Sequence, residues 1–192
     1  MPRTTRRKFD TDALIDAVID REGAYVNHPA DRGGATCWGI TEAVARAEGY
    51  VGAMRDLPRD DAAAIYRRLY WRRPAYDQVA RRAPAVAAEL FDTGVNMGTA
   101  TATGFLQRAL NALNRSARDY PDIAVDREIG PRTLSALDAF LRLRGAGGET
   151  VLLRAMEAMQ GERYIALAER RPGQEAFLYG WLANRIGEAG AP

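Results

Sequence analysis

Nearly every periodic stretch of this chain repeats with helical spacing, and this restricts the possible folds more than any other feature of the sequence. Apolar residues recur at three- and four-residue intervals through the segments 10–22, 42–48, 58–71, 84–98, 101–113, 131–144, 149–170 and 174–186. No run alternates with period two, so any sheet must be small and confined to the glycine-rich stretch 23–40. The sequence predicts a mainly α protein, a helical bundle with one small β-hairpin element around residues 25–40.

Length and composition are those of an ordinary globular protein. The chain has 192 residues, of which 47% are hydrophobic and 27% charged, enough for one proper core or two very small ones. No stretch is long and apolar enough to span a bilayer, and the basic residues 1–8, predicted to be disordered, lead into no apolar run of the kind that a secretory signal needs. The net charge of +2 suits an anionic polymer such as a cell wall and is far from that of a nucleic-acid binder. We therefore expect no binding of nucleic acid and no insertion into a membrane.

One carboxylate, Glu22, stands where the helical pattern requires an apolar residue. Ile15, Val18 and Ile19 form a stripe whose next position is residue 22, and Gly23 then suits a helix cap. We expect partial burial and the negative end of the helix dipole to raise the pKa of the Glu22 carboxyl, as a general acid requires. The alternative interpretation is a solvated last residue of the helix.

The long irregular stretch after this helix is typical of a functional loop, and it contains two further polar candidates. Asp31 supplies a second carboxylate, as glycosidic cleavage needs, or else caps its own backbone before Gly33 and Gly34. Thr36 is either a polar site residue or a strand residue with high β propensity.

Two motifs of this region, followed by others in order, carry a family resemblance. The two motifs are Glu22-Gly23-Ala24-Tyr25-Val26-Asn27 and Asp31-Arg32-Gly33-Gly34-Ala35-Thr36-Cys37-Trp38-Gly39-Ile40-Thr41. Together they resemble the N-acetylmuramidases of glycoside hydrolase family 108, found among phage endolysins. The later motifs are Ile65-Tyr66, Tyr70-Trp71, the segments 91–98, 106–110 and 129–134, and the closing segment 177–185. The resemblance covers about residues 9–187.

This resemblance implies a lysozyme-like fold and a peptidoglycan hydrolase. The segment 9–90 would be catalytic, and the helical segment 91–187 would resemble a peptidoglycan-binding module that completes one core with it. The bond cleaved would be the β-1,4 linkage between N-acetylmuramic acid and N-acetylglucosamine. Glu22 would be the proton donor, Asp31 would orient or activate the water, and Thr36 would help to hold it. No cofactor is implied.

We predict that substrate is bound by Tyr25, Asn27, Trp38, Asp92 and Asn96. Aromatic rings such as Tyr25 and Trp38 accept the C–H face of a pyranose, although core packing is the alternative for both. Asp92 and Asn96 share one helical face, where they either border a cleft or form a buried pair that fixes two helices.

Other chemistries are poorly supported by the sequence. His28 is the single histidine and Cys37 the single cysteine, whereas a catalytic zinc site usually needs three protein ligands and more than one histidine. We therefore expect no metal. The segment 126–137 resembles small peptidoglycan-binding modules, or it is a tight turn that leads into a core helix.

The resemblance also implies a setting and leaves two alternatives. A monomer without a signal sequence would stay in the cytoplasm until a holin-type pore released it to the periplasm and cell wall. A lytic transglycosylase would use the same glutamate, and a non-catalytic protein for wall binding or secretion belongs to another class.

Overall fold

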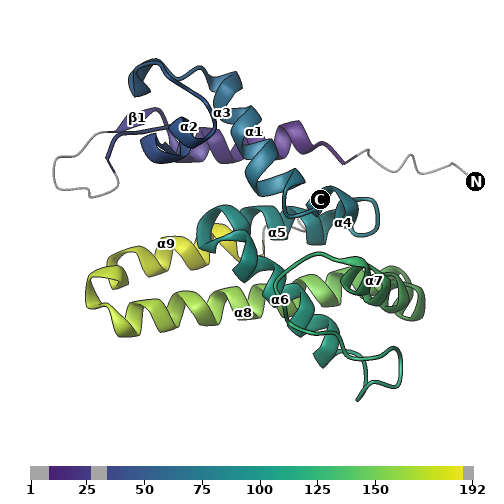
Figure 1. Ribbon diagram of the computed structural model, residues 1–192. Helices are drawn as coiled ribbons and strands as arrows, with labels where there is room; N and C mark the ends of the chain where they lie inside the picture. The colour runs from purple at the N-terminus through teal and green to yellow at the C-terminus, as the bar shows by residue number, and fades with distance from the viewer. Residues whose placement is uncertain (1–8, 27–33, 188–192) are drawn as a thin grey trace, which may run out of the picture. The chain divides into compact units, whose positions relative to one another are not determined.

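The computed structural model describes residues 9–26 and 34–187, and the chain separates into two compact units, Met1–Arg73 and Pro74–Pro192 (Figure 1). The predicted mainly α architecture is confirmed, with a small antiparallel sheet in the first unit. That the segments 9–90 and 91–187 complete a single core stays a prediction. In the described part of the chain, no helix has both the length and the apolar character needed to cross a membrane.

The first unit contains short helices around a three-stranded sheet. Its elements are α1 (Thr11–Glu22), β1 (Tyr25–Val26), β2 (Thr36–Cys37), β3 (Ile40–Thr41), α2 (Glu42–Ala47), η1 (Met54–Asp56), α3 (Arg59–Tyr66) and the π-helical turn η2 (Arg67–Arg72). The strands follow the order β1-β2-β3, all antiparallel. The predicted hairpin therefore has a third strand, because the chain reverses again directly after Cys37.

Helix α1 begins and ends where its capping residues predict. Asp10 Oδ1 accepts hydrogen bonds from the backbone N–H groups of Asp12 (3.0 Å) and Ala13 (3.1 Å). At the other end Gly23, with a φ of +75°, donates its N–H to Ile19 O at 3.2 Å. The helix buries Ile15, Val18 and Ile19, as its periodicity predicts.

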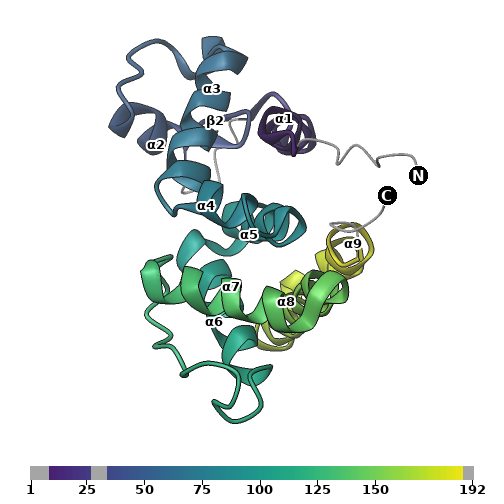
Figure 2. The same cartoon turned by 90° about the vertical axis from the view of Figure 1, so that its right-hand side faces the viewer.

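Helix α1 packs against α3, and both are visible in Figure 2. The Arg59 guanidinium bridges two carboxylates of α1, with N···O distances of 2.5 Å to Asp16 and 2.8 Å to Asp20. These pairs are largely exposed and contribute little to stability, so the apolar side chains hold the two helices together. The buried residues of α3 are Ala62, Ile65 and Tyr66.

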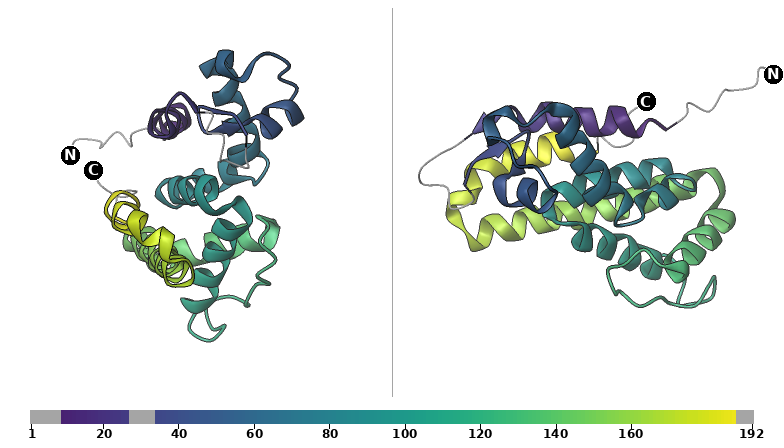
Figure 3. Two further views of the ribbon diagram at one scale, coloured as in Figure 1. Left: turned by 90° about the vertical axis from the view of Figure 1, so that its left-hand side faces the viewer. Right: turned by 45° about the horizontal axis from the view of Figure 1, so that its top comes forward.

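The second unit is entirely helical. Its elements are α4 (Tyr76–Ala80), α5 (Pro84–Met97), α6 (Thr99–Ala112), α7 (Pro131–Arg144), η3 (Gly145–Gly147), α8 (Gly148–Arg170), η4 (Pro172–Gln174) and α9 (Glu175–Arg185). Both views of Figure 3 show α8 and α9 side by side, and α5 and α6 pack on each other and on α8. The sequence pattern did not indicate α4, because a five-residue helix is too short to show a helical repeat.

Gln107, a buried amide of α6, holds the end of the long connection between α6 and α7. Gln107 Nε2 donates to Asp126 Oδ1 (2.6 Å) and to Glu128 O (3.0 Å), and Gln107 Oε1 accepts from the N–H of Arg127 (2.8 Å). Gln107 and Thr133 are buried. Segment 126–137 thus contains a turn that leads into the core helix α7, as the second of its two interpretations describes, and its binding of peptidoglycan stays a prediction.

Candidate active site

Glu22 is the last residue of α1. Its Cβ and Cγ atoms, called the stem below, pack against the chain, while the residue as a whole is exposed. The prediction of a carboxyl withdrawn from water is therefore wrong. The last buried residue of the stripe is Ile19, and the helix ends at Glu22, the next position of the stripe. Packing reaches the Cβ and Cγ atoms of Glu22, which lie against Gly39.

Gly39 is a close-approach glycine. A Cβ atom built on it would lie 2.5 Å from Tyr66 Oη, 2.9 Å from Glu22 Cβ and 3.0 Å from Glu22 Cγ. Its φ of +73° is also a conformation that side-chain-bearing residues rarely adopt. The backbone of the β2–β3 turn therefore touches the stem of Glu22 and the hydroxyl of Tyr66 at one point.

Tyr66 lies beneath this turn. The residue is 2% exposed, and its hydroxyl donates a hydrogen bond to Trp38 O at 3.1 Å. Burial raises the pKa of the Tyr66 phenol well above its usual value, and the negative charge of Glu22 raises it further. Tyr66 belongs to the Ile65-Tyr66 motif, and nothing in the sequence marks it as a site residue, since only the fold brings it to Glu22.

The strands place Thr36 and Tyr25 on the same small sheet. Thr36 faces Val26 across β1–β2 and donates its hydroxyl to Val26 O at 3.4 Å. Tyr25 is 36% exposed, and the Arg55 guanidinium carbon lies 5.9 Å from the centre of its ring.

Trp38 is half-buried, and its indole N–H donates to Leu57 O at 2.9 Å. This hydrogen bond anchors the indole to the chain at Leu57, and the substrate contact of Trp38 stays a prediction. Asp31 and Asn27 lie outside the described residues. Across residues 9–26 and 34–187, no group of three or more His, Cys, Asp or Glu side chains lies together as a metal cluster.

The predicted pair Asp92 and Asn96 belongs to the second unit and meets an arginine of α9. Arg185 Nη1 lies 3.4 Å from Asp92 Oδ2, and with its amide oxygen turned inward Asn96 accepts from Arg185 Nε at 2.9 Å. The side chains of Asp92 and Arg185 are 18% and 14% exposed. These contacts link α5 to α9, and Asn96 is exposed, so the pair is not fully buried.

A buried glutamate on α5 was missed by the sequence analysis. Glu89 is 2% exposed and accepts a hydrogen bond from Thr93 Oγ1 at 2.7 Å, and Gln160 Nε2 of α8 donates to the same Thr93 oxygen at 2.9 Å. Burial raises the pKa of the Glu89 carboxyl to about 7. The sequence does contain a signal for this residue, because the charged Glu89 interrupts the apolar stripe of α5 beside Leu90.

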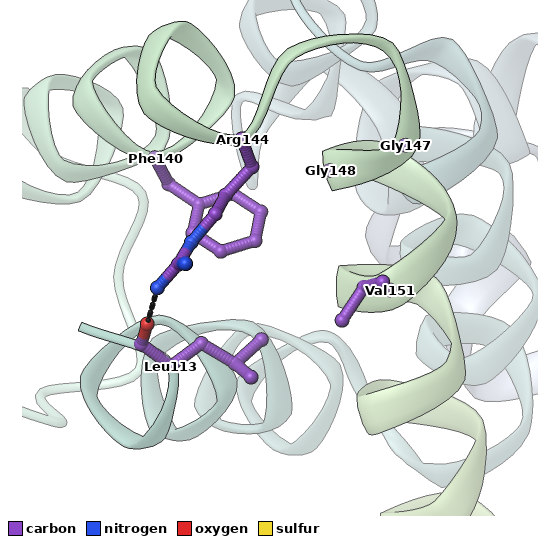
Figure 4. Close-up of a pocket in the computed structure, with 6 residues that line it drawn as sticks. All are labelled: Leu113, Phe140, Arg144, Gly147, Gly148 and Val151. Carbon is purple, nitrogen blue, oxygen red and sulfur yellow. Dashed lines mark hydrogen bonds between the residues drawn. The ribbon is translucent and has the colours of Figure 1, made fainter. Parts of the chain in front are cut away.

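The second unit also has a pocket of about 380 Å³ where α6, α7 and α8 meet (Figure 4). Phe140 and Arg144 form one side of it, with the guanidinium carbon 6.0 Å from the ring centre. Arg144 Nη2 donates to Leu113 O at 2.8 Å. None of the residues that the sequence analysis selected lines this pocket.

The two segments of the chain match two family models. Residues 15–98 match the glycosyl hydrolase 108 family, and residues 101–186 match a predicted peptidoglycan domain. Among solved structures, SagA of Brucella abortus is 26% identical, with a TM-score of 0.56 over 92% of this chain and 96% of that chain. No curated protein matches the chain at a significant level. The first segment therefore belongs to the glycosyl hydrolase 108 family, and the chain is a peptidoglycan hydrolase in which this glycosidase segment is followed by a peptidoglycan domain.

Proposed function

We propose that this protein is an N-acetylmuramidase that cleaves the β-1,4 bond between N-acetylmuramic acid and N-acetylglucosamine, with Glu22 as proton donor. The observation that carries the proposal is the arrangement of Glu22. Its Cβ and Cγ atoms pack on Gly39 next to Tyr66 Oη, while the residue remains exposed to solvent. A general acid needs this combination, because its position must be fixed and its proton must reach the substrate.

In the proposed reaction, the protonated Glu22 carboxyl gives its proton to the glycosidic oxygen as the bond from that oxygen to the anomeric carbon breaks. The leaving sugar departs as an alcohol, a water molecule adds to the oxocarbenium-like carbon and passes one proton to the solvent, directly or through Asp31, and the Glu22 carboxylate regains a proton from the solvent. Asp31 orients or activates that water. Thr36 helps to hold it, since its hydroxyl donates to Val26 O and its oxygen still has a lone pair to accept from water.

Substrate contacts are proposed for the residues around the small sheet and for two residues of α5. Tyr25, Asn27 and Trp38 would contact sugar rings, and Tyr25 has the ring exposure that stacking requires. Asp92 and Asn96 would contact the glycan from the second unit. Since both meet Arg185, their role in binding depends on how much of this polar cluster the glycan reaches.

The biological setting that we propose is that of a phage-type endolysin that causes bacteriolysis. The protein would act as a monomer, stay in the cytoplasm until a holin-type pore opens, and then reach the periplasm and cell wall. The family match of residues 15–98 supports this setting, because muramidases of this family occur among phage endolysins.

The test is digestion of purified sacculi by the wild type and by Glu22→Gln, which keeps the shape of the side chain and removes the acidic proton. We expect wild-type protein to clear the suspension and to release muropeptides with reducing muramic acid ends, and the variant to be inactive. Products with 1,6-anhydromuramic ends, together with an unimpaired Asp31→Asn variant, would identify a lytic transglycosylase instead. Binding to sacculi without any release would identify a non-catalytic wall-binding protein.

A further inference from the structure

The turn between β2 and β3 has a conformation that its sequence does not favour. Only Trp38 and Gly39 separate the paired residues Cys37 and Ile40, so the connection is a two-residue hairpin loop. Trp38 and Gly39 have φ angles of +54° and +73°, and a type I′ turn requires positive φ at both positions. Asparagine or glycine normally occupies the first position, whereas a bulky residue there is strained.

Such strain persists only where the surroundings impose it, and two hydrogen bonds do so here. The indole of Trp38 donates to Leu57 O at 2.9 Å, which anchors the side chain. The hydroxyl of Tyr66 donates to the carbonyl oxygen of Trp38 at 3.1 Å, which anchors the backbone of the turn itself.

This anchored backbone is the surface on which the stem of Glu22 rests. Both Tyr66 Oη and Glu22 Cγ lie within 3.0 Å of the position that a Gly39 Cβ would occupy. A shift of the turn away from Tyr66 would therefore remove the support of the Glu22 stem. Tyr66 is itself buried, whereas Glu22 has no helical turn after it to restrain it.

We propose that Tyr66 is a positioning residue for the proton donor, acting through the strained turn Trp38–Gly39. The inference rests on the proposed function of Glu22. It adds Tyr66 of α3, which lies outside the stretch that contains Asp31 and Thr36. Tyr66 holds the Trp38 carbonyl, the turn holds the Glu22 stem, and the carboxyl is thereby kept at one distance from the glycosidic oxygen. Because displacement of a catalytic group by about 1 Å can cost about 100-fold in rate, this support should affect the chemical step.

The experiment compares Tyr66→Phe with wild type in steady-state hydrolysis of soluble glycan strands. We expect kcat to fall by about 10- to 100-fold with KM within about twofold, since the hydroxyl contacts the turn and does not contact substrate. The matched control is Tyr70→Phe. Tyr70 is half-buried and its ring centre lies 5.5 Å from that of Tyr66, but it is Tyr66 that donates to the turn, so we expect wild-type kcat in this control. An unchanged kcat in Tyr66→Phe, or an equal loss in Tyr70→Phe, would overturn the proposal.

A double-variant cycle with Gly39→Ala tests the contacts among Gly39, Tyr66 and Glu22. In Gly39→Ala the new methyl group collides with Tyr66 Oη and with the Glu22 stem, so kcat should fall as in Tyr66→Phe. The double variant Gly39→Ala/Tyr66→Phe lacks the closest of these collisions. We therefore expect the Gly39→Ala change to cost less in the Tyr66→Phe background than in wild type, in both kcat and melting temperature. Fully additive losses would contradict the contact network.

The outcomes separate this inference from the proposed function. If Glu22→Gln retains wild-type activity, Glu22 is not the donor and the proposed function fails, whatever Tyr66 does. If Glu22→Gln is inactive while Tyr66→Phe has wild-type kcat, the function stands and the positioning role alone is wrong.

Discussion

Glu22 and Glu89 show two ways in which a helix can carry a glutamate into a folded protein. Glu89 lies inside the second unit with only 2% of its surface exposed, and burial raises its pKa to about 7. Glu22 lies at the end of a helix in the first unit, packed along its stem and exposed at the residue level. Burial changes proton affinity but also separates a carboxyl from any substrate. For the proposed role of Glu22 as proton donor, the comparison favours a side chain whose Cβ and Cγ atoms are fixed over one whose carboxyl is buried.

The largest expected effect is that of Glu22→Gln on activity. General acid catalysis contributes about 100- to 10,000-fold, so the rate of sacculus hydrolysis should fall by at least about 100-fold. The free energy of unfolding should change by less than about 0.5 kcal/mol. Turbidity loss and urea unfolding measure the two quantities. If the same substitution lowered stability by several kcal/mol, the side chain would be a buried structural residue and the comparison with Glu89 would fail.

The second effect is on the pH dependence of stability and concerns Glu89. Because its pKa is near 7 in the folded protein and 4.5 for an unperturbed glutamate, the folded state binds more protons than the unfolded state between these values. Stability should therefore fall as the pH rises from about 4.5 to 7, by on the order of 3 kcal/mol in total. In Glu89→Gln this dependence should disappear from urea unfolding at pH 5 and pH 8, with hydrolytic activity retained. An unchanged slope would show that Glu89 is already ionised in the folded state.

A smaller effect is expected at the contact between α5 and α9. Asp92→Asn removes the charge that faces Arg185, and hydrogen bonds between charged groups are worth about 1.5–3 kcal/mol. We expect a lower melting temperature and, since Asp92 is proposed to contact the glycan, a higher KM for soluble glycan strands. The matched variant Asp77→Asn removes an exposed charge that faces Arg81, and it should change neither quantity. A lower melting temperature at unchanged KM would contradict the proposed glycan contact of Asp92 and leave it a structural residue only.

The smallest effect concerns the amide beside Glu89. Within the described residues, Gln160 Oε1 is buried and has no hydrogen-bond partner, although Nε2 of the same side chain donates to Thr93. Gln160→Leu would lose one hydrogen bond and remove one unsatisfied oxygen, so the free energy of unfolding should change by less than about 1 kcal/mol. Urea unfolding at pH 5 measures the change. A loss of several kcal/mol would mean that the Gln160 oxygen has a partner such as an ordered water molecule.

Much of the fold could be predicted from the sequence because helix signals are local. Asp10 and Gly23 mark the two ends of α1, and Pro84 and Pro131 mark the first residues of α5 and α7. The third strand could not be predicted in the same way, since two-residue strands have no periodicity to detect.

The residues of the candidate site differ in the same way, because a local pattern marks some of them and only the tertiary fold marks the others. Glu22 could be identified because it is a carboxylate at a position of an apolar helical stripe. Glu89 stands in the apolar stripe of α5 in the same way, so it could have been identified by the same signal. Tyr66 follows its pattern, since a tyrosine suits the apolar face of α3, so nothing local distinguishes it. Its proximity to Gly39 depends on the tertiary packing of α1, α3 and the turn, which no single segment encodes.

The turn η2, which follows Tyr66 directly, has a consequence for the tolerance of this region to changes in length. A π-helical turn contains one more residue than an α-helical turn, so residues five positions apart come to lie on one face. Tyr66 and Trp71 are such a pair, and both are buried, with Trp71 stacked on Phe9 at a ring separation of 5.5 Å. Loss of a single residue between them would restore the narrower helix and rotate the indole away from its stacking partner. Homologues are therefore expected to keep the spacing of these two aromatic residues more strictly than the identity of the arginines between them.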